Sequence, residues 1–195
     1  MMNWRSTAHH WGIIAKTFHW LVALGIFALA GIGLYMVDMP LGMAQLKVYL
    51  LHKALGVTVL ALVLLRLLWR LFDRHPHYPA DMPRWQVGAA HASHALLYLL
   101  LLLLPISGWV YNSASGFPLP WFGLLQLPAI APVSKSLAHV ALSVHEIAFW
   151  VLAVVVLLHV MAALDHHFRH RDTVLARMLP WRYRSRVSNT RGDTP

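Results

Sequence analysis

The sequence predicts an all-α integral membrane protein, built as a four-helix bundle. Of its 195 residues, 58% are hydrophobic and only 12% are charged, whereas soluble domains have about 45–50% and about 25%. Four stretches are long and apolar enough to cross the ~30 Å hydrocarbon core, which takes about 20 residues of helix. This composition excludes an ordinary soluble enzyme, a disordered chain and a nucleic-acid-binding module, despite the net charge of +9.

We place the four transmembrane helices at about 18–37, 48–69, 94–111 and 140–164, within a single membrane domain that covers residues 1–195. The segment 112–137 is then the longest link between spans. We expect it to be an outer, periplasmic loop whose apolar stretch around Trp121 lies in the membrane interface. Residues 169–195 form a basic cytoplasmic tail. The start of the chain does not resemble a signal peptide, because no small-residue cleavage site follows its first apolar run.

Lysine and arginine are unevenly distributed between the two sides of this arrangement. With the N-terminus inside, 13 of the 16 lie on the inner side and three, Lys47, Lys53 and Lys135, lie outside. Such an excess marks the cytoplasmic side of a membrane protein. We therefore expect a multi-pass protein of the bacterial inner membrane with both termini in the cytoplasm. Contacts with anionic headgroups explain the basic charge, so no nucleic-acid partner is expected.

The 14 histidines outnumber the acidic residues two to one, and four of them have an informative spacing. His145 and His159 are 14 residues apart in the fourth span, so they lie on nearly one helix face and about 21 Å apart along the axis. His19 begins the first span at the inner level, and His52 begins the second span at the outer level. Ionisable residues inside a membrane are costly and usually functional.

Pairing by depth joins His19 with His159, and His52 with His145. Two imidazole pairs at two depths are what two six-coordinate haems need, and ligation on both faces favours electron transfer over oxygen chemistry. The chain has no cysteine, so the haems would be held non-covalently, as haem b. We predict two haems b with these four histidines as the iron ligands.

Small and basic residues also lie on the faces that carry the histidines. Gly33, Gly56 and Gly108 would let a flat macrocycle approach the backbone, although close contacts between helices have the same signature. Arg66 follows His52 by 14 residues and reaches the inner level. A buried guanidinium needs an anion, and a haem propionate is the expected one; snorkelling to the membrane surface is the alternative.

Three further histidines leave alternatives open. His91 and His94, at the inner start of the third span, compete with His19 as ligands or contact a propionate. His166 lies two turns beyond His159, at the inner surface. It is a candidate quinone contact, and an ordinary surface histidine is the alternative.

Six short motifs occur in order along the chain: FHW at 18–20, LHKALG at 51–56, LLRLLWR at 64–70, HASHALLYLLLLLLPISG at 91–108, VHE at 144–146 and LHVMAALDHHF at 158–168. Together they resemble the bacterial di-haem cytochrome b561 family, including its superoxide oxidase-like members. The resemblance implies the same two ligand pairs. It also implies an oxidoreductase that moves electrons between a periplasmic donor, superoxide in some members, and the ubiquinone pool, with His166 at the quinone end.

Two rival functions remain at this stage. A histidine-based metal or proton transporter would place carboxylates beside the histidines near the membrane midplane, and Glu146 is the only acidic residue well within a span. A membrane cytochrome b subunit of a larger dehydrogenase or hydrogenase would need a docking surface for its partner.

Overall fold

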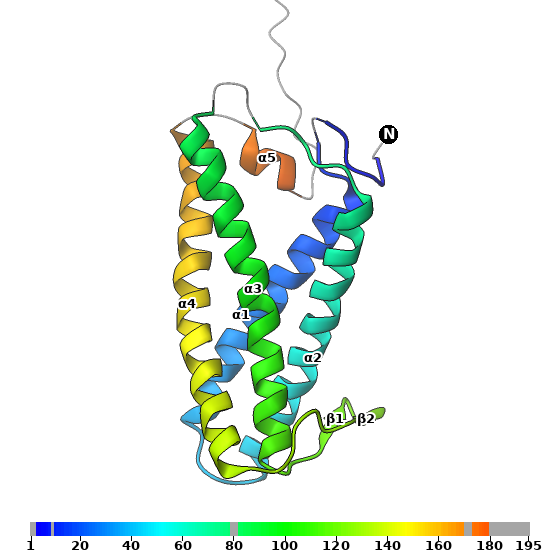
Figure 1. Cartoon of the computed structure of the whole chain (residues 1–195), viewed down its shortest axis with the longest axis vertical. Coiled ribbons are helices and arrows are strands. Elements are labelled where there is room, and N and C mark those ends of the chain that lie inside the picture. The colour runs from blue at the N-terminus through cyan, green and yellow to red at the C-terminus, as the bar shows by residue number, and fades with distance from the viewer. Residues whose placement is uncertain (1–2, 9, 79–81, 170–172, 180–195) are drawn as a thin grey trace, which may run out of the picture.

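A bundle of four long helices dominates the computed structural model, which describes residues 3–8, 10–78, 82–169 and 173–179 (Figure 1). The helices are α1 (Ile13–Val37), α2 (Met43–Phe72), α3 (Arg84–Ala114) and α4 (Lys135–Phe168). Within the described residues, these are the four helices long and apolar enough to cross a membrane. The predicted fold class, an integral membrane four-helix bundle, is confirmed.

Each helix contains its predicted span and continues beyond it. α1 begins at Ile13 rather than near residue 18, and α3 begins at Arg84 rather than near residue 94. The sequence pattern marks only the residues that need hydrocarbon, whereas backbone hydrogen bonding continues into the polar flanks. His19 therefore lies in the second turn of α1 instead of at its start, and His94 lies well inside α3.

The helices form two closely packed pairs, α1 with α2 and α3 with α4, and the pairs meet mainly through α2 and α3. The shared core is small and apolar, and it includes Val22, Val59, Val63, Leu101, Leu152 and Val155. Other large apolar side chains point outward: Phe27 is 59% exposed and Leu157 is 60% exposed. In water such a surface would be a liability, but it suits contact with lipid. Notably, α1 and α4 are not among the closely packed pairs.

One end of the bundle, here called the α5 end, is closed by the N-terminal segment, the link after α2 and the short helix α5 (Val174–Met178) (Figure 1). The backbone N–H and hydroxyl of Ser6 donate to the two carboxylate oxygens of Asp73, at 2.9 and 2.5 Å. The indole of Trp20 donates to the carbonyl of Met178 at 2.9 Å. Three segments distant in sequence are thereby fixed together. The predicted basic tail beyond Leu179 lies outside the described residues.

The opposite end, here called the hairpin end, carries the link between α3 and α4. It contains two antiparallel strands, β1 (Leu119–Trp121) and β2 (Leu125–Leu127), with Trp121 opposite Leu125. Phe122 and Gly123 both have positive φ angles, of 50° and 74°, the left-handed backbone that tight hairpin loops use. The Trp121 indole donates to the hydroxyl of Thr58 on α2 at 3.1 Å. The apolar loop is thus an ordered hairpin fixed to the bundle, which the sequence did not predict.

Candidate functional site

Two pairs of imidazole rings face each other between the helices, one pair toward each end of the bundle. His19 of α1 and His159 of α4 have ring centres 6.4 Å apart. His52 of α2 and His145 of α4 have ring centres 6.3 Å apart. These are the partners that pairing by depth predicts.

The near-equal separation of the two pairs has a chemical meaning. About 2.0–2.1 Å from a metal to each imidazole nitrogen, and about 1.1 Å from that nitrogen to its ring centre, place two opposed ring centres about 6.2–6.4 Å apart. Both pairs therefore have the spacing of two axial imidazoles on one metal. Their role as iron ligands stays a prediction, and the residues present fit a haem at each level.

Helix α3 holds the ring of His145 in place. Its Nδ1 lies 2.9 Å from the carbonyl oxygen of Leu104 and 3.2 Å from the hydroxyl of Ser107. Pro105, the next residue of α3, has no N–H, so the carbonyl of Leu101 loses its helical donor. Because Nδ1–H donates to a backbone carbonyl, Nε2 is left with its lone pair, which is the usual arrangement of a histidine that binds a metal.

His52 is packed differently. Its Nδ1 is buried and has no hydrogen-bond partner, and leaving a buried polar atom unpaired is costly. A Cβ at Gly33 would come within 3.2 Å of its Cε1. One turn further along α2, a Cβ at Gly56 would meet nothing within 4 Å.

The glycines therefore divide into two kinds. At Gly33 the predicted space for a macrocycle is instead taken by the His52 ring, and at Gly108 it is taken by the His145 ring. At Gly56 the space is open. The sequence pattern identifies the small residues. It does not distinguish a glycine that an imidazole ring packs against from one that leaves space for a cofactor.

Arg66 sits beside the inner pair, as the 14-residue step predicts. Its Nη2 lies 3.2 Å from Nδ1 of His19, and its guanidinium lies 5.4 Å from the ring centre of Tyr98. A guanidinium only donates hydrogen bonds, so Nδ1 of His19 accepts here. None of the described carboxylates pairs with Arg66. The guanidinium of Arg66 is therefore a strong hydrogen-bond donor without an anionic acceptor among the described residues.

His94 adds a third imidazole near the inner pair. Its ring centre is 5.5 Å from that of His159, with the planes at 77°. This is an edge-to-face contact, shorter than the spacing that fits a shared metal, and the Nδ1 of His94 lies 2.6 Å from the carbonyl of Ala90. His91 instead faces the ring of Tyr78, at 5.4 Å. The hydrogen bond of His94 to a backbone carbonyl is of the kind that leaves Nε2 free for a metal, so only the spacing of the ring centres favours His19 as the partner of His159.

The remaining candidates lie apart from the two pairs. His166 is half-buried on α4, seven residues or about 10 Å beyond His159, and its role stays a prediction. Within the described residues, no three histidine or acidic side chains gather into a metal-binding cluster. Glu146 is exposed on α4. Neither observation favours the transporter hypothesis.

Four helices able to cross a membrane, with an imidazole pair toward each end, are the arrangement expected of membrane-embedded haem proteins of electron transfer. The model of the family described as prokaryotic cytochrome b561 matches residues 10–181. The chain belongs to this family: it is a multi-pass membrane protein of electron transport, and the family implies haem b as its cofactor.

Curated relatives agree with this assignment. The chain is 34% identical over 181 residues to "Cytochrome b561 homolog 2" of Escherichia coli (strain K12), covering 91% of this chain and 95% of that protein. It is 33% identical over 132 residues to "Probable superoxide oxidase CybB" of Yersinia pestis, covering 67% of this chain and 74% of that protein. "Cytochrome b561 homolog 1" of Escherichia coli (strain K12) is 31% identical over 135 residues, with the same two coverages.

Proposed function

We propose that this chain is a di-haem b-type cytochrome that passes electrons across the bacterial inner membrane, between a periplasmic donor and the ubiquinone pool. The observation that carries the proposal is the matched spacing of the two histidine pairs, 6.4 and 6.3 Å between ring centres. They lie at levels about 21 Å apart along α4. When bound, haem b supplies a one-electron carrier, and the protein sets its position, potential and access.

Each of the two haem sites would have its own histidine pair, at its own depth in the membrane. His19 and His159 would hold the inner haem, and His52 and His145 the outer one. Arg66 would donate to a propionate of the inner haem. That carboxylate would draw the guanidinium away from Nδ1 of His19, which could then carry a proton while Nε2 binds iron.

The α5 end carries most of the arginines of the described residues, so we infer that it faces the cytoplasm. The hairpin end would face the periplasm and the donor, for which superoxide is our candidate. The relative named as a probable superoxide oxidase supports this choice, as does Lys53, half-buried directly after His52. His166, at the inner end of α4, is the proposed quinone contact.

Two variants test the haem assignment separately. His159→Ala should lose the inner haem and keep the outer one, and His145→Ala should do the converse, so each should fall from two haems per chain to one by the pyridine haemochrome assay. His139→Ala, on the exposed outer part of α4, is the matched control and should keep both. A colourless wild-type protein, or two haems retained in either variant, would refute the assignment.

The donor and acceptor need a second experiment on the purified protein. Stopped-flow mixing with superoxide and a soluble ubiquinone analogue should give haem reduction followed by quinol formation. If the haems form but superoxide does not reduce them, and a dehydrogenase co-purifies from native membranes, the chain is a subunit of a larger complex instead.

A further inference from the structure

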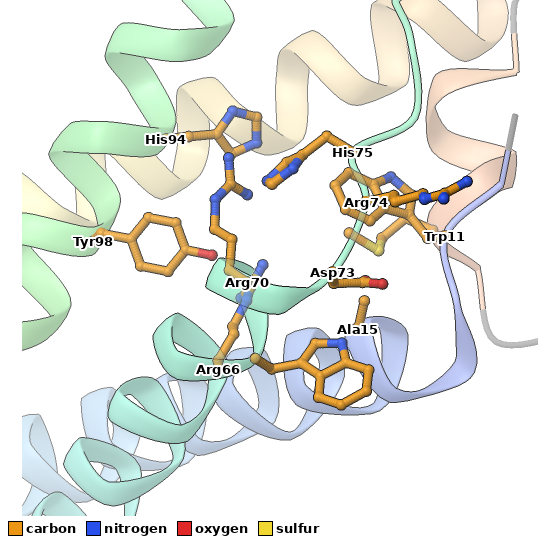
Figure 2. Close-up of a pocket in the computed structure, with 11 residues that line it drawn as sticks. Trp11, Ala15, Arg66, Arg70, Asp73, Arg74, His75, His94 and Tyr98 are labelled. Carbon is orange, nitrogen blue, oxygen red and sulfur yellow. The ribbon is translucent and has the colours of Figure 1, made fainter. Parts of the chain in front are cut away.

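A small cavity of about 50 Å³, with basic side chains in a largely apolar lining, lies at the α5 end, where α2 ends (Figure 2). Arg66 and Arg70, one turn apart on α2, and Arg74, two residues after α2 ends at Phe72, all line it. His75 and His94 complete its basic lining. Figure 2 shows Arg70 reaching up beside the hydroxyl of Tyr98 toward His94 and His75, and Arg74 lying beside Trp11.

The positive charge in this cavity is only partly balanced. Asp73 is the one carboxylate among its lining residues, and Ser6 donates to both of its oxygens. Arg66 and Arg70 both lie over the ring of Tyr98, with their guanidinium carbons 5.4 and 5.7 Å from its centre. The two like charges on this ring repel each other, and an anion beside them would offset that repulsion.

Two further observations point to a missing acceptor. The indole Nε1 of Trp69, another lining residue, is buried and has no hydrogen-bond partner. The pKa of His75, in the link after α2, is lowered by burial and by the charge of Arg70. The lining is therefore rich in donors and cations, which is the environment that stabilises an oxyanion.

We propose that this cavity binds an oxyanion of the phosphate class, held by Arg70 and Arg74 with the indole N–H of Trp69 as a neutral donor. On this measure of volume a cavity holds one water at about 10–15 Å³, so about 50 Å³ leaves room for a small tetrahedral group. That group comes either from the headgroup of an anionic lipid, because basic pockets at this depth between helices suit such headgroups, or from free phosphate.

The site does not depend on the proposed electron-transfer role. Arg66 remains the proposed partner of the haem propionate, whereas the oxyanion is assigned to Arg70 and Arg74. Its binding can therefore be measured by methods that do not use haem chemistry.

The test uses the full-length haem-loaded protein in two arms. In the first, inorganic phosphate is titrated by calorimetry into protein held in nanodiscs of neutral phosphatidylcholine. In the second, native mass spectrometry counts the phosphatidylglycerol molecules retained after release from mixed nanodiscs. Arg70→Gln and Arg74→Gln should each weaken binding by about tenfold or more, the usual loss for a charged hydrogen bond. Arg84→Gln, an exposed arginine at the same end, should bind as the wild type does.

The two arms separate the sources of the oxyanion. Retained lipid without phosphate binding assigns the site to a headgroup, and phosphate binding without retained lipid assigns it to the free ion. If the wild type binds neither, or if both variants bind as it does, the proposal is wrong. It is also wrong if phosphate binds only to His159→Ala, because the cavity would then belong to the haem propionate. Because Arg74 is exposed, Arg74→Gln keeps the test valid even if Arg70→Gln does not fold.

Discussion

The imidazole Nδ1 of His145 donates to the carbonyl oxygen of Leu104 at 2.9 Å, across the contact between α4 and α3. The ring also lies against Gly108, where a Cβ would come within 3.3 Å of its Cε1 and Nδ1. One helix therefore supplies the imidazole and another fixes its orientation. The direction of Nε2, and with it the geometry of any bound iron, depends on the packing of α3.

Gly108→Ala should disturb the outer haem site. The added Cβ needs the His145 ring to move by a few tenths of an ångström, and the bond to Leu104 resists that movement. Changes to such supporting contacts typically weaken metal binding by about 10–100-fold. We expect the outer haem to dissociate at least about tenfold faster, measured as transfer of haem to apomyoglobin.

Gly31→Ala is the matched control, because a Cβ at Gly31 in α1 meets nothing within 4 Å. Its haem should dissociate as in the wild type. Equal rates in both variants would show that the contact between Gly108 and His145 does not hold the ring.

Arg66→Leu should lower the midpoint potential of the inner haem. A positive charge near the iron favours the reduced state, so its removal favours the oxidised one. One unit charge at about 10 Å and an effective dielectric constant near 20 contributes about 1.7 kcal/mol, or about 70 mV for one electron. A potentiometric titration followed at the haem α-band measures the shift.

Arg66→Lys keeps the charge but loses the two-pronged donor, so most of the potential should be retained in that variant. The outer haem serves as an internal control, since its potential should hardly move in either protein. An unchanged inner potential in Arg66→Leu would reject the propionate contact.

The helices and the histidine pairs could be predicted because both depend on helical periodicity. Apolar runs fix which residues cross the membrane, and the 14-residue step from His145 to His159 fixes their faces and depths. The helix ends could not be predicted, because hydrogen bonding extends past the apolar residues. Arg66 could be placed at the inner level from the sequence, but its position beside Arg70 in the wall of a cavity could not.

Contacts between segments far apart in the chain could not be predicted from the sequence, for a different reason. Nothing local links Ser6 to Asp73, or Trp121 to Thr58, because each bond depends on how two elements meet in space. His94 was visible as a candidate, but only the ring distances separate it from His19. The tight turn at Phe122 and Gly123 left a weak signal, a lone glycine within an apolar stretch.

Ser6→Ala should loosen the N-terminal segment. The Ser6 hydroxyl donates to Asp73 and accepts from the backbone N–H of Gly12 at 2.9 Å, and Ser6 is 4% exposed. Its loss removes the partner of the Gly12 N–H and of one carboxylate oxygen of Asp73, and should destabilise the fold by about 1–3 kcal/mol. Thermal unfolding measures the global effect, and the rate of tryptic cleavage after Arg5 measures the local one.

Thr17→Ala, at an exposed position on α1, is the control and should leave both the unfolding temperature and the cleavage rate nearly unchanged. If Ser6→Ala is cleaved after Arg5 no faster than the control, the bond to Asp73 does not hold the segment.

If superoxide is the donor, its reaction rate should depend on salt and on Lys53. Lys53 follows His52, and its Nζ lies 5.3 Å from the ring centre of Phe117 at the hairpin end. A positive charge beside the entry site raises the local concentration of a small anion, and salt screens that attraction over a Debye length of about 8–10 Å. The second-order rate constant for haem reduction by superoxide should therefore fall as ionic strength rises.

Lys53→Gln should react with superoxide several-fold more slowly at low salt and show a flatter salt dependence. Arg84→Gln, at the opposite end of the bundle, should match the wild type. A rate that does not change with ionic strength would exclude electrostatic attraction by Lys53.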